Sequence, residues 1–366
     1  MNAPEIQVSR GRGAGYQPPT PMATAAATPT TSRRLRRSDL SAPGYTRRRC
    51  GKGFMYLDEE GERITDAEIV ARIVALVIPP AWQDVWISPD PFGHIQATGI
   101  DARGRKQYLY HLRWRVRRDQ EKFDDMIAFA RALPALRSVV EHDITLGGMS
   151  REQVLACAAR LLDRGFFRIG SEEYKVTNET YGLATMLKRH VTLNGENIRF
   201  DYTAKERKRR VQAIIDPEVA AIVGTLKRRR GGGEELLAYK RGGRWCDVRS
   251  PDINAYLKAA TTRDISAKDF RTWGATVLAA VGLAVTQPKQ LSAPARKRAI
   301  VRAVKEVAFY LGNTPTVARN SYIDPRVFDR YRDGETIPLD PVGAVPDATA
   351  IQGPVEEAVL DLLDEG

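Results

Sequence analysis

The sequence predicts an α+β protein in which a small β-rich N-terminal domain precedes a larger, mainly helical domain. Residues 54–118 alternate apolar and polar side chains between turns that contain Pro and Gly, a pattern typical of short strands. After about residue 119, apolar residues recur every three to four positions, which is typical of helices. A β-hairpin near residue 194 interrupts these helices.

Caps and turns locate the first elements of the larger domain. Ser150 opens a capping box for a helix that we expect to end at Gly165. Asn194 and Gly195 lie between two alternating runs, which predicts a β-hairpin. A second, charged turn follows around Lys205.

Helices resume after this β segment. Ser266 caps the next one, and a further apolar stripe ends at Gly312. Thr314 and Pro315 then supply an N-cap and a first-turn proline for a short helix that ends near Tyr322.

Both ends of the chain differ in composition from its body. The N-terminal residues are rich in Pro, Thr, Ala and Arg, which cannot build a core, so we predict a disordered basic arm there. The stretch Asp340–Gly366 has seven acidic residues and no Lys or Arg. We therefore expect four segments: the arm (1–53), a small β-rich domain (54–118), a larger, mainly helical domain (119–332) and an acidic tail (333–366).

The net charge of +12 understates how basic the body is, because the tail is acidic. Such a body indicates a polyanionic partner, most often nucleic acid, although solvated charged faces without a partner are the alternative. No apolar run approaches the ~20 residues that span a bilayer, and the N-terminus has no apolar signal segment. We expect a cytoplasmic protein without membrane association. Its three scattered cysteines predict neither a disulfide framework nor a zinc site.

Common catalytic signatures are missing from the sequence. It has no G-x-x-x-x-G-K-[ST] phosphate loop, no H-E-x-x-H and no G-x-S-x-G, so we expect neither a metal nor another cofactor. Four segments instead supply positive charge and one hydroxyl: F-F-R-I-G, Y-T-A-K-E-R-K, K-D-F-R-T-W-G and L-G-N-T-P-T-V-A-R-N-S-Y.

At these four segments the sequence resembles the type IB DNA topoisomerases, particularly the poxvirus-like enzymes found in many bacteria. The resemblance covers roughly residues 54–332 in both order and spacing. It implies that the catalytic residues are Arg168, Lys205, Arg271, Asn313 and Tyr322. The lysine follows the first arginine by 37 residues, the asparagine follows the second by 42, and the tyrosine comes nine later.

The resemblance implies an enzyme that relaxes supercoiled DNA by cutting and resealing one strand without metal or ATP. The phenol of Tyr322 would attack a phosphodiester and become a 3′-phosphotyrosine, which conserves the bond energy. Arg168 and Arg271 would stabilise the extra charge on the non-bridging oxygens, with a neutral hydrogen bond from Asn313. Lys205 would protonate the leaving 5′-oxygen.

Several assignments have alternatives. Many family members have Gly before the hairpin lysine, whereas this chain has Ala204, and Lys208 competes with Lys205 for the role of general acid. The basic cluster around this turn is also consistent with a plain phosphate-contacting surface. The tyrosine alone reads as a half-buried core residue, the two arginines as surface ion-pair partners, and the asparagine as a turn cap.

Further residues are expected to contact double-stranded DNA. The segment Gln107-Tyr108-Leu109-Tyr110 resembles the Q-Y-x-Y that contacts DNA in the family, and strand alternation places both tyrosines on one face. An aromatic core pair is the alternative. Lys268, three residues before Arg271, is also expected to contact DNA. We expect a nucleoid-associated monomer whose two domains close around the duplex as a clamp.

Two other functions share part of this pattern. A tyrosine recombinase uses the same arginine, lysine and tyrosine chemistry, but usually carries H-x-x-R where this chain has K-D-F-R-T-W-G. A DNA-binding protein without catalysis would need only the basic surface. Relaxation of a supercoiled plasmid in EDTA separates the last reading from the enzyme, and strand exchange between defined sites would identify a recombinase.

Overall fold

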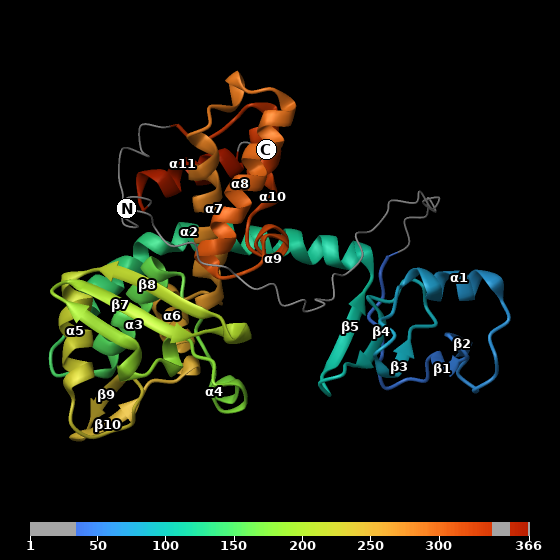
Figure 1. Ribbon diagram of the computed structural model, residues 1–366, viewed down its shortest axis with the longest axis horizontal. Helices are drawn as coiled ribbons and strands as arrows, with labels where there is room; N and C mark the ends of the chain where they lie inside the picture. The colour runs from blue at the N-terminus through green and yellow to red at the C-terminus, as the bar shows by residue number, and fades with distance from the viewer. Residues whose placement is uncertain (1–33, 339–351, 365–366) are drawn as a thin grey trace, which may run out of the picture. The chain divides into compact units, whose positions relative to one another are not determined.

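The computed structural model describes residues 34–338 and 352–364 (Figure 1). The chain divides into two compact units after Val116, close to the predicted boundary at residue 118. Small antiparallel sheets and a helical core confirm the predicted α+β class. Within the described ranges, no helix is long and apolar enough to cross a membrane.

The N-terminal unit is built on a three-stranded antiparallel sheet with β4 in its centre. Its elements are β1 (Thr46–Cys50), β2 (Gly53–Leu57), α1 (Ala67–Ala75), β3 (Gln83–Ile87), β4 (Ile95–Ile100) and β5 (Lys106–Tyr110). Helix α1 begins where Asp66 accepts hydrogen bonds from two main-chain amides of the first turn. It buries Ile73 against Val85, Ile87 and Ala97 in a small core of its own. The sequence pattern did not predict this helix.

The predicted disordered arm is wrong over residues 34–53. Tyr45 forms an isolated antiparallel bridge with Ile87, and β1 pairs with β2. The guanidinium of Arg47 donates to three main-chain carbonyls of residues 78–82 and lies 4.1 Å from the ring centroid of Phe54. These partners lie far along the chain, so the local composition of the arm does not reveal them. Residues 1–33 lie outside the described part.

The second unit is organised around α3, which contacts α5, α6 and α7 and is buried along most of its length. Ser150 accepts a hydrogen bond from the amide of Gln153 at its start, and the helix ends at Gly165, as predicted. The other α-helices described up to residue 338 are α2 (Leu112–Ile144), α4 (Glu172–Asn178), α5 (Pro217–Arg228), α6 (Ser250–Thr261), α7 (Ala267–Ala284), α8 (Ala293–Leu311), α9 (Pro315–Ser321) and α10 (Pro325–Asp333), besides α1 of the N-terminal unit. Helix α3 itself covers Arg151–Gly165.

The predicted hairpin at Asn194-Gly195 is confirmed. It joins β6 (Val191–Asn194) to β7 (Asn197–Thr203), and β8 (Arg209–Ile215) pairs with the other edge of β7. The inward side chains of β7 are buried, and Phe200 meets Phe167 edge to face at 4.9 Å between ring centroids. This contact fixes the sheet beside the loop that follows α3. A further hairpin, β9 (Ala238–Arg241) and β10 (Arg244–Asp247), was not predicted.

Part of the predicted acidic tail is a folded helix, α11 (Pro354–Asp364), which contacts α7 and α10 (Figure 1). Its buried side chains are Val355, Val359, Leu362 and Leu363, spaced as one helical face. Glu356 on the same helix bonds to Arg137 at 2.6 Å and to the indole of Trp273 at 2.8 Å. The prediction of an acidic tail rested on the acidic residues of this segment alone and did not include the apolar face.

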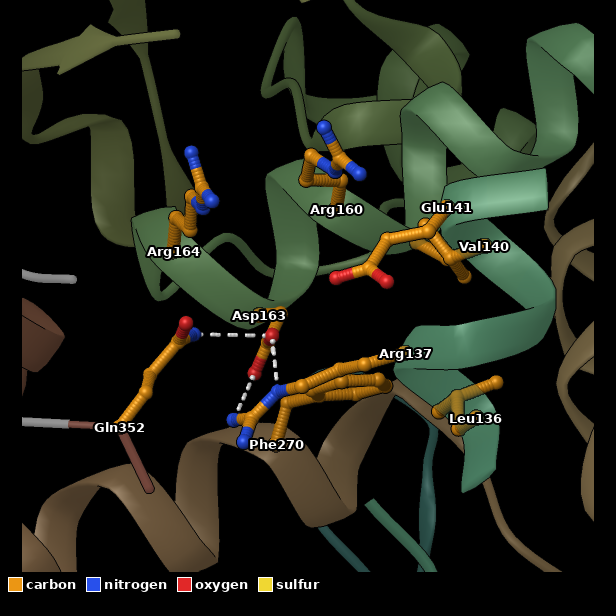
Figure 2. Close-up of a pocket in the computed structure, with 10 residues that line it drawn as sticks. Leu136, Arg137, Val140, Glu141, Arg160, Asp163, Arg164, Phe270 and Gln352 are labelled. Atoms are coloured by element: carbon orange, nitrogen blue, oxygen red, sulfur yellow. Dashed lines mark hydrogen bonds and ion pairs between the residues drawn. The ribbon is translucent and has the colours of Figure 1, made fainter. Parts of the chain in front are cut away.

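A small cavity of about 40 Å³ lies between α2, α3 and α7 (Figure 2). Figure 2 shows Arg137 joined to Asp163, which also accepts from Gln352 at 2.9 Å. The Arg137–Asp163 bonds measure 2.8 and 3.0 Å. The cavity is too small for a nucleotide, and the charges of Arg137 and Asp163 at its centre are paired with each other. We therefore regard it as a packing defect between the helices.

Candidate active site

Four of the five predicted catalytic residues, Arg168, Arg271, Asn313 and Tyr322, come together at the C-terminal end of α8. Arg168 lies in the loop after α3, Arg271 is on α7, and Lys205 is on the turn between β7 and β8. Asn313 precedes α9 and Tyr322 ends it. The chain turns between α8 and α9 because Gly312 adopts a left-handed φ of 62° and the Thr314 hydroxyl caps α9.

Three arginines bind four successive carbonyls at the end of α8, those of residues 309–312. Arg210 donates to the first two at 2.9 and 2.5 Å, Arg271 to the third at 3.0 Å and Arg168 to the fourth at 3.0 Å. The last carbonyls of a helix have no partner within it and form the negative end of its dipole. The helix end therefore holds three guanidinium groups in fixed positions.

Arg271 is the most buried of these arginines, with 3% of its surface exposed. Its second terminal nitrogen donates to the carbonyl of Phe166 at 2.5 Å, and its guanidinium carbon lies 5.2 Å from the ring centroid of Tyr322. Burial and the neighbouring charge of Arg168 lower the pKa of Arg271 to about 10, so it remains a cation at neutral pH. Its buried Nε has no hydrogen-bond partner within the described ranges.

Asn313 is oriented by two hydrogen bonds. Its main-chain amide donates to the carbonyl of Ala308 at 2.9 Å, and its side-chain oxygen accepts from Arg168 at 2.5 Å. The side-chain nitrogen is buried and has no partner among the residues that the structure describes. A buried donor without a partner costs about 1–3 kcal/mol. Both this nitrogen and the Nε of Arg271 are thus donors available to an anion.

Tyr322 is half-buried against the main core, and α7 fixes its backbone. The hydroxyl of Thr276 on α7 donates to the carbonyl of Tyr322 at 3.4 Å and accepts from the amide of Asp324 at 3.1 Å. Burial alone would raise the pKa of the phenol. The charge and hydrogen bond of Arg271, followed by the charges of Arg168 and Lys268, lower the pKa of Tyr322 below its usual value.

The turn that carries Lys205 does not require glycine at position 204. Ala204 has a φ of −95°, whereas the left-handed residues are Glu206 and Arg207, at 65° and 57°. The Lys208 ammonium binds the Glu206 carboxylate at 2.7 Å. Lys205 is exposed and forms no hydrogen bond or ion pair within the described part of the chain. Of the two candidate acids, Lys205 is the one left free.

Three of the four expected DNA-contacting residues are exposed, whereas Gln107 is half-buried. Tyr108 and Tyr110 are 40% and 42% exposed on one face of β5, with their ring centroids 6.1 Å apart. They are therefore not the aromatic core pair of the alternative reading. Gln107 donates to Asp101 at 3.0 Å. Lys268 is exposed in the first turn of α7, and its charge contributes to the lowered pKa of the tyrosine that ends α9.

Arg210 and Thr276 were not singled out from the sequence, although both shape the site. Arg210 appeared only as one member of a basic cluster. The alternation of exposed and inward side chains along β8 places Arg210 on the inward face with Gln212 and Ile214, and this was the available signal. Thr276 gives no such signal, because its role depends on a contact between α7 and the segment after α9.

Two family models match the chain. The model of the eukaryotic DNA topoisomerase I catalytic core matches residues 111–335, more than half of the chain. The chain belongs to the type IB DNA topoisomerases. The model of the bacterial DNA topoisomerase IB N-terminal domain matches residues 53–101 of this topoisomerase. The resemblance inferred from the four segments is thereby confirmed, and the topoisomerase is a DNA-binding isomerase.

Viral topoisomerases are among its relatives. The DNA topoisomerase 1B of Acanthamoeba polyphaga mimivirus is 26% identical over 304 residues, which cover 79% of this chain and 88% of the viral one. The DNA topoisomerase 1B of Vaccinia virus (strain Copenhagen) is 20% identical over 237 residues, or 64% and 72% of the two chains. The DNA topoisomerase 1 of Rabbit fibroma virus (strain Kasza) is 23% identical over 235 residues, or 63% and 70%. The topoisomerase I core model ends at residue 335, before α11.

Proposed function

We propose that this topoisomerase relaxes supercoiled DNA through a 3′-phosphotyrosyl intermediate on Tyr322. One observation carries the proposal: two buried donors have no partner among the described residues, the Nε of Arg271 and the side-chain nitrogen of Asn313, and Arg271 lies against the ring of Tyr322. Orphaned donors in a cationic site suit the non-bridging oxygens of a phosphodiester. The lowered pKa of the phenol favours the nucleophilic phenolate.

Arg168 and Arg271 each use some of their N–H groups for hydrogen bonds within the protein and keep others for DNA. Arg168 uses one terminal nitrogen for Gly312 and Asn313, and its Nε and other terminal nitrogen have no hydrogen-bond partner in the described ranges. Arg271 uses both terminal nitrogens for carbonyls and retains Nε. The bonds to the helix end fix the guanidinium planes before DNA arrives, so little reorganisation is needed when charge develops on the phosphorane.

Lys205 is the proposed general acid. In the cleavage step Tyr322, which has released its phenol proton to solvent, forms a bond from its phenolate oxygen to phosphorus, the bond from phosphorus to the 5′-oxygen breaks, and the lysine transfers a proton to that oxygen. The free ammonium of Lys205 and the ion pair between Lys208 and Glu206 support this choice. Resealing reverses each transfer. The free energy of the broken bond is retained in the phosphotyrosine, so neither ATP nor a metal is part of the proposed cycle.

We infer that each of the two units carries residues that contact duplex DNA, in a monomeric, nucleoid-associated enzyme of the cytoplasm. The exposed pair Tyr108 and Tyr110, together with Gln107, would contact the duplex from β5, and Lys268 would contact it from the catalytic unit. The high positive charge of the chain supports binding to the phosphate backbone.

The test is relaxation of a supercoiled plasmid in EDTA. The wild-type enzyme should relax it, and Tyr322→Phe should not, although its affinity for a duplex should stay nearly the same. Tyr239→Phe, on β9 outside the site, is the matched control and should relax DNA like the wild type. Relaxation by Tyr322→Phe would refute the assignment of the nucleophile, and a requirement for divalent cation would refute the metal-independent cycle.

A further inference from the structure

Arg210 connects the hairpin that carries Lys205 to the end of α8. Arg210 lies at the start of β8, where it pairs with Tyr202 of β7. Its guanidinium donates to the carbonyls of Phe309 and Tyr310 at 2.9 and 2.5 Å. Among the described residues, these are the only hydrogen bonds between the β7–β8 hairpin and α8 or α9.

The same guanidinium packs on the residue where α8 turns toward α9. A Cβ atom added to Gly312 would lie 3.0 Å from one terminal nitrogen of Arg210 and 3.2 Å from its Cδ and Cζ. Arg210 therefore touches the segment that leads directly to Asn313. This contact and the two hydrogen bonds link one rigid strand to the corner that carries the asparagine and, one short helix later, the nucleophile.

We propose that Arg210 is a positioning residue, which sets the Lys205 turn at the correct place relative to Asn313 and Tyr322. The proposal rests on the assignment of Lys205 as general acid. The attacking oxygen and the leaving oxygen lie on opposite sides of one phosphorus, so the general acid and the nucleophile must be held at fixed positions relative to each other. Arg210 fixes these relative positions through its contacts within the protein, and it contacts no reacting atom.

The neighbouring Arg209 provides a matched control. It lies one position earlier on β8, so its side chain faces the opposite side of the strand. It is bonded to Asp201 of β7 at 2.7 Å, and its side chain is 72% exposed. Replacing Arg209 with alanine removes the same charge from the same strand and leaves the end of α8 untouched.

The experiment measures single-turnover cleavage of a duplex at saturating enzyme. Arg210→Ala should cleave about 10- to 10²-fold more slowly than the wild type, the scale of loss expected when reacting groups are misplaced by about 1 Å. Its affinity for the duplex should change less than its cleavage rate. Arg209→Ala should cleave at the wild-type rate. Arg210→Lys should recover part of the rate, because an ammonium can still bind one of the carbonyls.

A duplex with sulfur in place of the bridging 5′-oxygen identifies the step that Arg210 serves. The thiolate leaves without protonation, so a residue that acts through the acid becomes dispensable. Most of the Arg210→Ala deficit should disappear on this substrate. On ordinary DNA the double variant of Arg210 and Lys205 should be no slower than Lys205→Ala alone.

Failure of this inference differs from failure of the proposed acid. If Lys205→Ala cleaves ordinary DNA at the wild-type rate, the acid assignment is wrong. If Lys205→Ala is slow and rescued by sulfur while Arg210→Ala is equally slow on both substrates, only the positioning role is refuted. An Arg209→Ala defect as large as that of Arg210→Ala would likewise overturn it, since charge alone would then explain the loss. Thermal unfolding of Arg210→Lys checks that its rate is measured on folded protein.

Discussion

Replacement of Arg271 by alanine should slow DNA cleavage and also lower the free energy of unfolding, and the two effects can be measured separately. Its guanidinium is 3% exposed and bonded to the carbonyls of Phe166 and Leu311. Its Nε is the orphaned donor that we assign to the phosphorane. Loss of one preorganised donor to a developing oxyanion lowers the rate about 10²- to 10³-fold, or ~2.7–4 kcal/mol in activation free energy. We expect at least 10²-fold slower cleavage at saturating DNA.

The stability cost follows from the two carbonyls left behind. Each buried group without a partner costs about 1–3 kcal/mol, so Arg271→Ala should lower the free energy of unfolding by about 2–6 kcal/mol. Water that enters the vacated space would reduce this cost toward the lower end. Chemical denaturation of the free protein measures the loss of stability, and single-turnover cleavage measures the loss of catalytic rate.

The pH dependence of cleavage gives a third readout of Arg271→Ala. The charge and hydrogen bond of Arg271 contribute most to lowering the pKa of Tyr322, against the effect of burial. Without them the pKa of the phenol should rise, and cleavage should require a higher pH. If Arg271→Ala loses DNA affinity and cleavage in parallel and keeps the wild-type pH profile, Arg271 is a phosphate anchor and the reasoning fails.

Three further outcomes follow from other parts of the structure. Asn313→Ala should slow cleavage about tenfold, since a neutral hydrogen bond is worth ~1 kcal/mol or somewhat more, and an unchanged rate would remove it from the site. Deleting residues 1–33 should leave the melting temperature unchanged and make DNA binding less dependent on salt. Deleting residues 1–53 should lower the melting temperature, because β1 is lost. Equal melting temperatures for the two deletion variants would contradict this prediction. Glu356→Ala should lower the free energy of unfolding in urea by about 1–3 kcal/mol, because the indole of Trp273 loses its acceptor and Arg137 keeps only its bonds to Asp163; a change below ~0.5 kcal/mol would show that the bonds of Glu356 do not stabilise α11.

The proposed catalytic residues could be inferred from the sequence because chemistry restricts which residue types can do the work and in what order. Helix caps such as Ser150, the Asn194-Gly195 turn and the stop at Gly312 are local signals, so the elements that carry these residues were also predictable. The short distance between Arg168 and the end of α8 could not be read locally. It depends on a tertiary contact between Arg168 and Gly312, which are 144 positions apart in the sequence.

The misses share one physical cause, which is dependence on distant partners. Arg47 looks like part of a solvated basic arm until the carbonyls of residues 78–82 are placed beside it. Val355 and Val359 lie in an acidic segment and reveal their core face only when α7 covers them. Arg210 was hidden in a run of basic residues, because charge density says nothing of which guanidinium is directed at a helix end.

The central claim is tested most directly by identifying the amino acid bound to DNA. A labelled duplex is cleaved in EDTA, the complex is trapped with detergent, and the protein is digested for mass spectrometry. We predict one modified peptide, with the 3′-phosphate of the cut strand attached to Tyr322, and no adduct from Tyr322→Phe. A 3′-adduct on any other residue, a 5′-linked adduct, or an adduct formed by the Phe variant would contradict the account.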